Sequence, residues 1–178
     1  MVESKHPLTG ISGYVLTGQG AGVKPAYAAG GGGGESENVV RKTTDTANST
    51  TTLADAAGLS FAAQANSDYI VEGWIIYTTS ATTVGIKLSA KGPTSPVALA
   101  GLWDVNAAQG TPDGGAFNAD DVAIAASAAP FTTNNLARLH CLLRTAANAG
   151  TFIIRFAAET TGTITIKAGS LLRYRKVL

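Results

Sequence analysis

The feature that most constrains the fold is a long alternation of side chains at residues 69–77. Side chains on a β-strand point alternately to the two faces of a sheet. The two sets are Tyr69, Val71, Gly73, Ile75 and Tyr77 on one side, and Ile70, Glu72, Trp74 and Ile76 on the other. A strand that is apolar on both faces suits the inside of a sandwich or a subunit interface. Because Glu72 is the only charge on its face, Trp74 is predicted to be buried between sheets or between subunits.

Residues 38–178 predict about eight strands joined by short turns, which is an all-β fold. Thr82–Ala90 alternates and is expected to form a hairpin with the preceding strand through Ser80 and Ala81. Residues 136–145 place Leu139, Cys141 and Leu143 on one face; a helix is the alternative, but a hairpin with residues 151–156 is favoured. The remaining candidate strands are 39–43, 51–53, 59–63, 163–167 and 170–177. This pattern predicts a jelly-roll-like antiparallel β-sandwich.

Residues 97–130 lack sustained alternation and are rich in Gly and Ala. They are predicted to form a long loop with short strand or helical pieces, and such loops commonly serve function or an interface. Within this loop, Trp103 is the better candidate for an exposed platform, beside Asp104. These two residues are the candidate ligand platform, and a saccharide is the ligand class that a tryptophan face would suit.

The composition predicts a thin core and few charge-driven partners. Apolar residues make up 45% of the chain, but 31 of them are Ala, so large core-forming side chains are scarce. A chain of this kind is expected to complete its core with partner subunits. The net charge is only +1, which argues against nucleic acid or an anionic membrane as a partner. The single cysteine, Cys141, is expected to be a small buried hydrophobe.

Residues 1–37 differ from the rest of the chain and are interpreted as an extended attachment arm with a glycine hinge at residues 30–34. Five consecutive glycines have high backbone entropy and no side chain to bury. Residues 38–178 are expected to form the β-sandwich domain. No stretch has the length or apolar character of a membrane span or a signal peptide.

The sequence predicts no catalytic residue, no cofactor-binding residue and no metal ligand. A nucleophile-elbow motif is missing, and the two histidines, His6 and His140, have no spacing suited to zinc. The glycine-rich run that ends at Lys24 departs from the phosphate-binding loop pattern. Four aspartates in or beside the long loop are interpreted as solvated acids, with structural calcium as the alternative; they are Asp104, Asp113, Asp120 and Asp121.

Two parts of the chain resemble tailed-phage virion proteins. Residues 13–27, GYVLTGQGAGVKPAY, are similar to an arm segment of phage fibre proteins, with Tyr27 in its aromatic position. The remainder is similar to virion proteins of the decoration or fibre type. The matching features are the Thr-rich residues 50–55, the Leu59-Ser-Phe61 strand, the aromatic strand at 69–77, the Gly92-Pro93 step and the closing strand at 169–172. The chain is much shorter than common fibres and has no shaft repeats.

The resemblance implies a non-enzymatic bacteriophage structural protein, assembled in the host bacterial cytoplasm and located in the virion. It implies a homotrimer whose arm docks on another virion protein, either the major capsid protein or a tail or adaptor protein. The arm residues that the resemblance assigns to attachment are Tyr14, Val15, Leu16, Pro25 and Tyr27. The competing interpretation is a host-receptor domain of a short tail fibre that binds a surface glycan through Trp103 and Asp104.

Overall fold

The structure is a computed structural model, and it describes residues 14–17, 26–29 and 37–177. The chain divides into two compact units, residues 1–34 and 35–178. In the first unit, β1 (Tyr14–Thr17) pairs antiparallel with β2 (Ala26–Ala29), and Leu16 lies opposite Tyr27. The sequence analysis expected no strand in this segment. The second unit is called the β-domain below.

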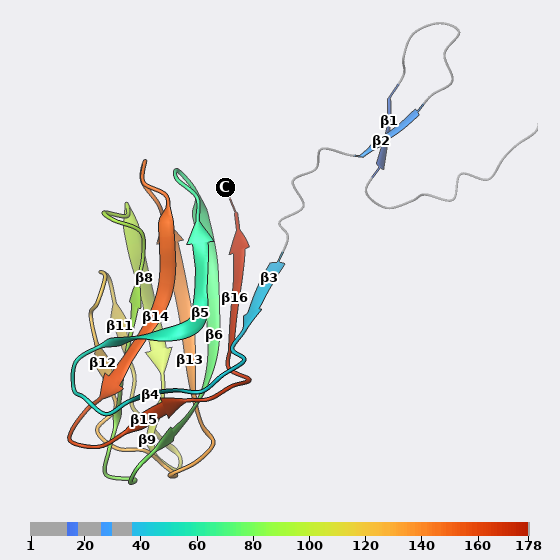
Figure 1. Cartoon of the computed structure of the whole chain (residues 1–178). Helices are drawn as coiled ribbons and strands as arrows, with labels where there is room; N and C mark the ends of the chain where they lie inside the picture. The colour runs from blue at the N-terminus through green and yellow to red at the C-terminus, as the bar shows by residue number, and fades with distance from the viewer. Residues whose placement is uncertain (1–13, 18–25, 30–36, 178) are drawn as a thin grey trace, which may run out of the picture. The chain divides into compact units, whose positions relative to one another are not determined.

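The β-domain is a sandwich of two antiparallel sheets, which confirms the predicted fold class (Figure 1). The four-stranded sheet has the order β12-β7-β14-β5, and the eight-stranded sheet has the order β11-β8-β13-β6 followed by β15 and β4, with β16 and β3 beside them. A separate β9-β10 ribbon lies at the end of β8. The described residues contain no helix that is long and apolar enough to cross a membrane. The strands are β3 (Glu37–Arg41), β4 (Thr46–Asn48), β5 (Ala54–Ala63), β6 (Asp68–Thr79), β7 (Ile86–Lys91), β8 (Ala98–Asp104), β9 (Asn106–Ala108), β10 (Thr111–Pro112), β11 (Gly115–Phe117), β12 (Ile124–Ala125), β13 (Asn135–Arg144), β14 (Gly150–Ala158), β15 (Ile164–Ile166) and β16 (Leu171–Lys176).

Strand β6 is the centre of the eight-stranded sheet. One edge pairs with β13 along residues 68–77, and the other edge pairs first with β16 and then with β15. Between β15 and β16 the chain turns at Gly169, whose φ of +93° suits glycine. The hydroxyl of Ser170 fills this break and accepts a hydrogen bond from the Ile76 amide at 3.0 Å. The hydrogen bonding along this edge of β6 is therefore continued across the turn by the side chain of Ser170.

The neighbouring break, between β3 and β4, encloses a buried lysine. Lys42 has no exposed surface, and its ammonium donates to Thr46 Oγ1 at 2.6 Å and to the Ala57 carbonyl. Its backbone amide donates to the Ser170 carbonyl at 2.9 Å. Burial lowers the pKa of Lys42 because the charged form loses hydration, and nearby Asp45 partly opposes this shift. Lys42 thus ties the β3–β4 connection to β5 and to the start of β16.

The core lies between the two sheets and is built from alternate residues of each long strand. Strand β6 contributes Tyr69, Val71, Ile75 and Tyr77, which are all buried. The ring of Phe61 stacks on Tyr174 with centroids 3.8 Å apart and contacts Phe152 at 5.2 Å and Tyr69 at 5.3 Å. This aromatic cluster joins β5 and β14 of one sheet to β6 and β16 of the other.

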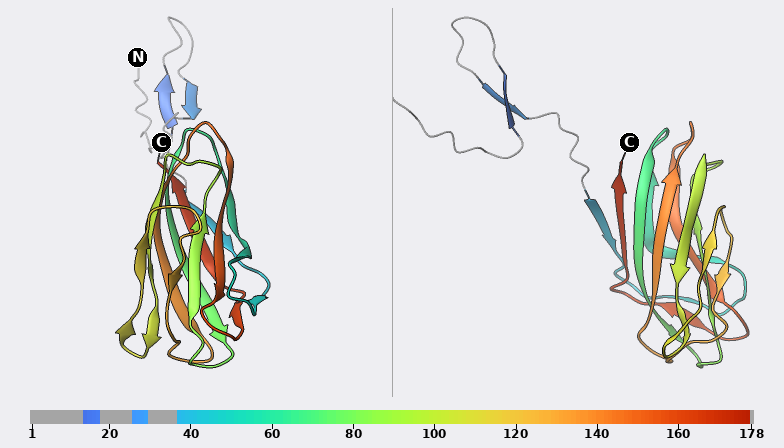
Figure 2. Two further views of the ribbon diagram at one scale, coloured as in Figure 1. Left: turned by 90° about the vertical axis from the view of Figure 1, so that its left-hand side faces the viewer. Right: turned by 180° about the vertical axis from the view of Figure 1, so that it is seen from behind.

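Two predicted hairpins are wrong. Strands β6 and β7 belong to different sheets, and so do β13 and β14. In both cases the connecting turn carries the chain across the sandwich, so consecutive strands face each other through the core and do not pair. Figure 2, in its view from behind, shows the eight-stranded sheet with β3 and β16 at one side. Turn signals in the sequence reveal that the chain reverses, but not whether it changes sheet.

The predicted long loop at 97–130 is also corrected. Its first part is β8, which pairs with β13 over seven register positions and with β11 on its other edge. Ala and Gly at positions 98, 100 and 101 conceal the alternation, although Leu99 and Trp103 are both buried. The predicted strand at 51–53 is not observed, while β4 and a longer β5 lie on either side of it.

Cys141 lies on the core side of β13 and is 4% exposed, so the expectation of a buried thiol is confirmed. Burial raises its pKa to about 12. At pH 8 roughly one thiol in ten thousand is then ionised, and the thiolate is the reactive form. We expect Ellman's reagent to label the folded protein very slowly and to label one thiol per chain in guanidinium chloride. A Cys141→Ala, Val97→Cys chain, with its thiol at an exposed site, is the positive control; fast labelling of native wild type would contradict this burial.

Candidate functional site

The unusual surface of the β-domain is the outer face of its eight-stranded sheet. It consists of the side chains that alternate with the core residues on five neighbouring strands, and we call this set the outer face. Its members are Ala98, Ala100, Leu102 and Asp104 of β8; Leu136, Arg138, His140, Leu142 and Arg144 of β13; Asp68, Ile70, Glu72, Trp74 and Ile76 of β6; Leu171, Arg173 and Arg175 of β16; and Glu37, Val39 and Arg41 of β3.

Large apolar side chains are concentrated on this outer face. Four of the six large apolar side chains that are exposed among the described residues belong to it: Val39 and Leu142 at 60%, Leu136 at 49% and Leu102 at 41%. Single exposed apolar residues are common, but a group of them on one face marks an interaction surface. The second face of β6, which the sequence analysis predicted to be apolar, is therefore a surface of the single chain and not part of its core.

The outer side of the four-stranded sheet is different. Its cross-strand positions carry small or polar residues and charges: Ser60 and Asp55 on β5, Thr151 and Arg155 on β14, and Lys87, Ser89 and Lys91 on β7. Ile153 is the one large apolar residue among these positions, and it is only partly exposed. The two sides of the sandwich thus differ in chemistry although both are outer sheet surfaces.

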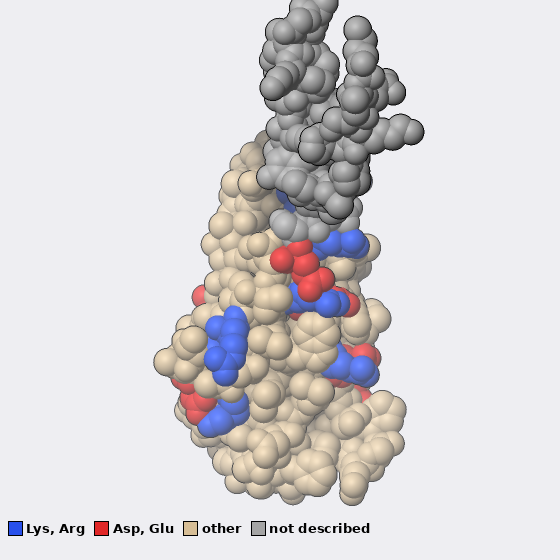
Figure 3. All heavy atoms as spheres, turned by 90° about the vertical axis from the view of Figure 1, so that its right-hand side faces the viewer, with Lys and Arg blue, Asp and Glu red and all other residues tan. Residues whose placement is uncertain are grey.

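Most of the charged residues on the outer face lie in pairs of opposite sign. Arg144 and Asp68 lie opposite each other at 3.0 Å, and Arg138 lies 3.6 Å from Asp104. Arg173 donates from Nε to Glu72 at 2.8 Å and lies 3.4 Å from Glu37. The hydrogen bond to Glu72 raises the pKa of Arg173 above its ordinary value. On the side of the β-domain near β3 and β16, neither sign forms a continuous patch (Figure 3).

Trp74 lies on the outer face, half-buried by its neighbours in the sheet. The guanidinium carbon of Arg173 is 5.2 Å from the centre of its ring, a cation–π contact. The prediction that Trp74 lies between the two sheets is therefore wrong: Tyr69, Val71, Ile75 and Tyr77 point into the sandwich and Trp74 points away from it. Burial of Trp74 between subunits stays a prediction.

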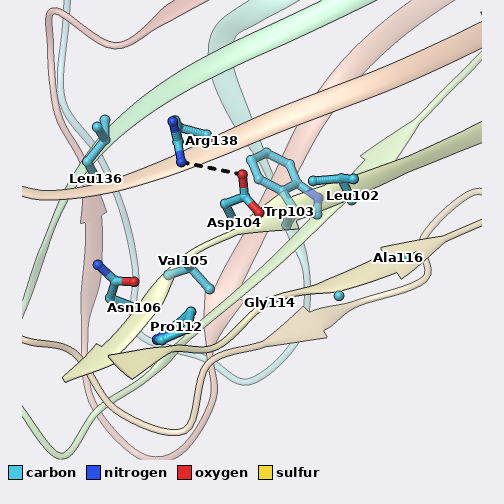
Figure 4. A pocket seen from close by; sticks show the side chains of 11 residues that line it. Leu102, Trp103, Asp104, Val105, Asn106, Pro112, Gly114, Ala116, Leu136 and Arg138 are labelled. Atoms are coloured by element: carbon cyan, nitrogen blue, oxygen red, sulfur yellow. Dashed lines mark ion pairs between the residues drawn. The ribbon is translucent and has the colours of Figure 1, made fainter. Parts of the chain in front are cut away.

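Two hollows lie along the β8–β13 part of the outer face. One, of about 460 Å³, is formed mainly by Ile70, Leu102, Leu142 and His140. The other is a cleft of about 750 Å³ between the end of β8, the start of β13 and the β9-β10 ribbon (Figure 4). Leu102 borders both. The cleft combines the apolar side chains of Leu102, Leu136 and Pro112 with the Arg138–Asp104 ion pair.

The structure places the two residues of the candidate ligand platform beside this cleft but in opposite environments. Trp103 is 1% exposed, so the expectation of an exposed ring is wrong. Its indole N–H has no hydrogen-bond partner among the described residues, and the ring is held by apolar packing. Asp104 is exposed and paired with Arg138 (Figure 4). A role of Asp104 in ligand binding stays a prediction.

Four of the five candidate attachment residues lie in the two strands of the first unit. Tyr14, Val15 and Leu16 belong to β1 and Tyr27 to β2, while Pro25 lies outside the described residues. The structure brings Leu16 opposite Tyr27 and Val15 opposite Ala28. Their assignment to attachment stays a prediction.

The four aspartates weighed as calcium ligands have separate partners. Asp120 accepts from the Gly92 amide at 2.8 Å, Asp113 accepts from the Ser127 amide at 3.0 Å, and Asp121 lies 2.6 Å from Arg155. Asp104 pairs with Arg138. Within the described part of the chain, no three His, Cys, Asp or Glu side chains gather in a way that could hold a metal ion.

No family model matches this sequence, and no curated protein matches it. Among solved structures, the chain is similar to VP2 of infectious bursal disease virus in a subviral particle, with 8% identity and a TM-score of 0.25 over 92% of this chain and 44% of that one. The Gt strain of the same virus gives 8% identity and a TM-score of 0.26, over 92% and 46%. A CocE/NonD family hydrolase from Staphylococcus aureus gives 10% identity and a TM-score of 0.25, over 86% and 39%.

Viral capsid proteins are thus among the solved structures to which this chain is similar. The chain spans less than half the length of each of these structures. With such low TM-scores, and with a hydrolase among the matches, these likenesses assign no function. The resemblance to tailed-phage fibre proteins is not confirmed by them. What the chain does has to be inferred from its own residues.

The two tryptophans give a direct test of which face of the sheet is the core. Trp103→Ala is expected to lower the free energy of unfolding by about 3–5 kcal/mol, because a fully buried ring is removed. Trp74→Ala is expected to cost less than half as much within a single chain. Urea unfolding should be followed at a protein concentration at which the chain sediments as a monomer. A larger loss for Trp74→Ala than for Trp103→Ala would contradict the assignment.

Proposed function

We propose that this chain is a non-enzymatic structural protein of a bacteriophage virion, of the capsid-decoration or fibre type. In this proposal it assembles as a homotrimer, and the segment before β3 attaches it to the major capsid protein or to a tail or adaptor protein. The observation that carries the proposal is the outer face: the β-domain has a core on one side of its large sheet and, on the other side, a surface with exposed large apolar side chains. A protein built in this way is suited to assembly.

The sequence resemblance supports the virion assignment, and the division of the chain supports the separation of roles. Among the residues whose burial is described, all the buried apolar residues of the core cluster lie between Ala56 and Leu172, within the β-domain. The first unit carries the segment that resembles phage fibre arms. Attachment and folding are therefore assigned to different parts of the chain.

Saccharide binding by a short tail fibre is the second candidate function, and the cleft beside Asp104 is the observation that favours it. Asp104, Arg138 and Asn106 supply polar groups there next to apolar walls. The buried ring of Trp103 offers no face on which a sugar could stack, which weakens this candidate. The structural role is the function that the molecule supports best.

Mass spectrometry of purified particles of the encoding phage tests the proposal. We expect the chain to be present in a fixed copy number per particle. A chain lacking residues 1–34 is expected to keep the thermal unfolding midpoint of the β-domain within a few degrees and to be missing from particles. Incorporation of the truncated chain at normal copy number would show that the first unit is dispensable.

A full-length control variant tests whether attachment depends on the apolar side chains of the arm or only on the presence of the arm. In this variant Tyr14, Val15, Leu16 and Tyr27 are all replaced by Ser in the full-length chain. We expect it to fold like wild type and to be lost from particles, because attachment is assigned to these side chains. Normal incorporation of this variant would contradict their assignment.

A further inference from the structure

We infer that the outer face is the contact surface between copies of this chain, so that the eight-stranded sheet is covered on one side by its own core and on the other by a second copy. This inference deepens the proposed function and rests on its claim of self-assembly. It adds the surface, which the proposed function does not name. Its central residues are Leu102, Leu142, Ile70 and Trp74.

The kinds of cation on the outer face favour a protein interface. Its five cations are all arginines, with no lysine at its described positions: Arg41, Arg138, Arg144, Arg173 and Arg175. Arginine and aromatic residues are enriched in protein interfaces, whereas lysine is depleted. The outer side of the four-stranded sheet carries Lys87 and Lys91 as well as Arg155. The two outer sheet surfaces thus differ in the cations that they carry.

The balance of charge favours a second copy as the occupant. Four acids, Glu37, Asp68, Glu72 and Asp104, accompany the five arginines, and several pairs already satisfy each other within one chain. A surface of one sign would repel its own copy, because like charges brought together cost free energy. A mixed and nearly neutral surface does not repel an identical one. A partner that is recognised through its net charge would need a surface with charges of one sign. The outer face carries both signs in nearly equal number.

The shape of the outer face also fits a copy of itself. Leu142 projects with 60% of its surface exposed, and it stands at the border of the hollow that Ile70, Leu102 and His140 help to form. One surface therefore carries both a projecting apolar side chain and an apolar hollow. In a symmetric assembly each copy can place its Leu142 against the hollow of another.

The test is sedimentation of full-length chains that carry a charge at matched exposed positions. Leu142→Glu places a carboxylate on the outer face, and Val97→Glu places one at a residue of similar exposure that precedes β8 and is not a member of this face. Wild type and Val97→Glu are expected to form the same assembly at micromolar concentration. Leu142→Glu is expected to raise the dissociation constant at least about a hundredfold, since the carboxylate would be buried without a partner. Leu102→Glu, on the next strand, is a second variant for the same effect.

Circular dichroism and thermal unfolding show whether each variant is folded. The inference is supported if folded Leu142→Glu or Leu102→Glu is monomeric while Val97→Glu assembles. It is overturned if the folded outer-face variants assemble like wild type, if Val97→Glu dissociates equally, or if wild type is monomeric. A monomer that is recovered with a different virion protein on this face also overturns it. A monomeric wild type would also contradict the proposed homotrimer, whereas the other results leave the homotrimer standing. None of these results removes the chain from purified particles, so the virion assignment is tested separately.

Discussion

The structure depends on the pairing of β6 along both of its edges. Strand β13 pairs with it over residues 68–77 on one side, and β16 and β15 share the other side, with Ser170 bonding to Ile76 at the break. This central position makes one face of β6 part of the sandwich core, where Tyr69 contacts the ring of Phe61. The same pairing arranges Ile70, Glu72 and Trp74 beside residues of β13 and β16 on the outer face. The pairing of β6 therefore determines both which residues form the core and which form the outer face.

Alternation in the sequence identifies β6, β13 and the two sets of residues on each, because strand geometry makes the period of two unavoidable. Alternation does not say which set faces the core. On β6 both sets are apolar, so the sequence predicts burial of Trp74 between sheets or between subunits, and only the first alternative is wrong. Trp103 was missed as a core residue because Ala98, Ala100 and Gly101 hide the pattern of β8. Burial of that ring depends on the register with Leu139 of β13, a long-range pairing that no local signal contains.

The sequence predicts only part of the candidate site, because the site also depends on long-range strand pairing. The two apolar faces of residues 69–77 predicted a surface for subunits, but its other members come from β8, β13, β16 and β3, which the sequence does not show to be neighbours. Asp104 was singled out, whereas its partner Arg138 and the pairs Asp68–Arg144 and Glu72–Arg173 follow only from strand register. The outer face is therefore a product of topology: five strands that are distant in sequence bring apolar residues, arginines and acids into one sheet surface.

The most direct test of the account is the access of a small quencher to Trp74 in the assembled and in the dissociated protein. Trp103 is almost completely buried within a single chain, so acrylamide should not reach it in either state, and fluorescence quenching reports on Trp74. The account predicts weak quenching at high protein concentration and stronger quenching after dilution to monomers, because separation of the copies exposes the outer face. Equal quenching of Trp74 in assembled and monomeric protein would contradict the claim that a second copy covers this surface.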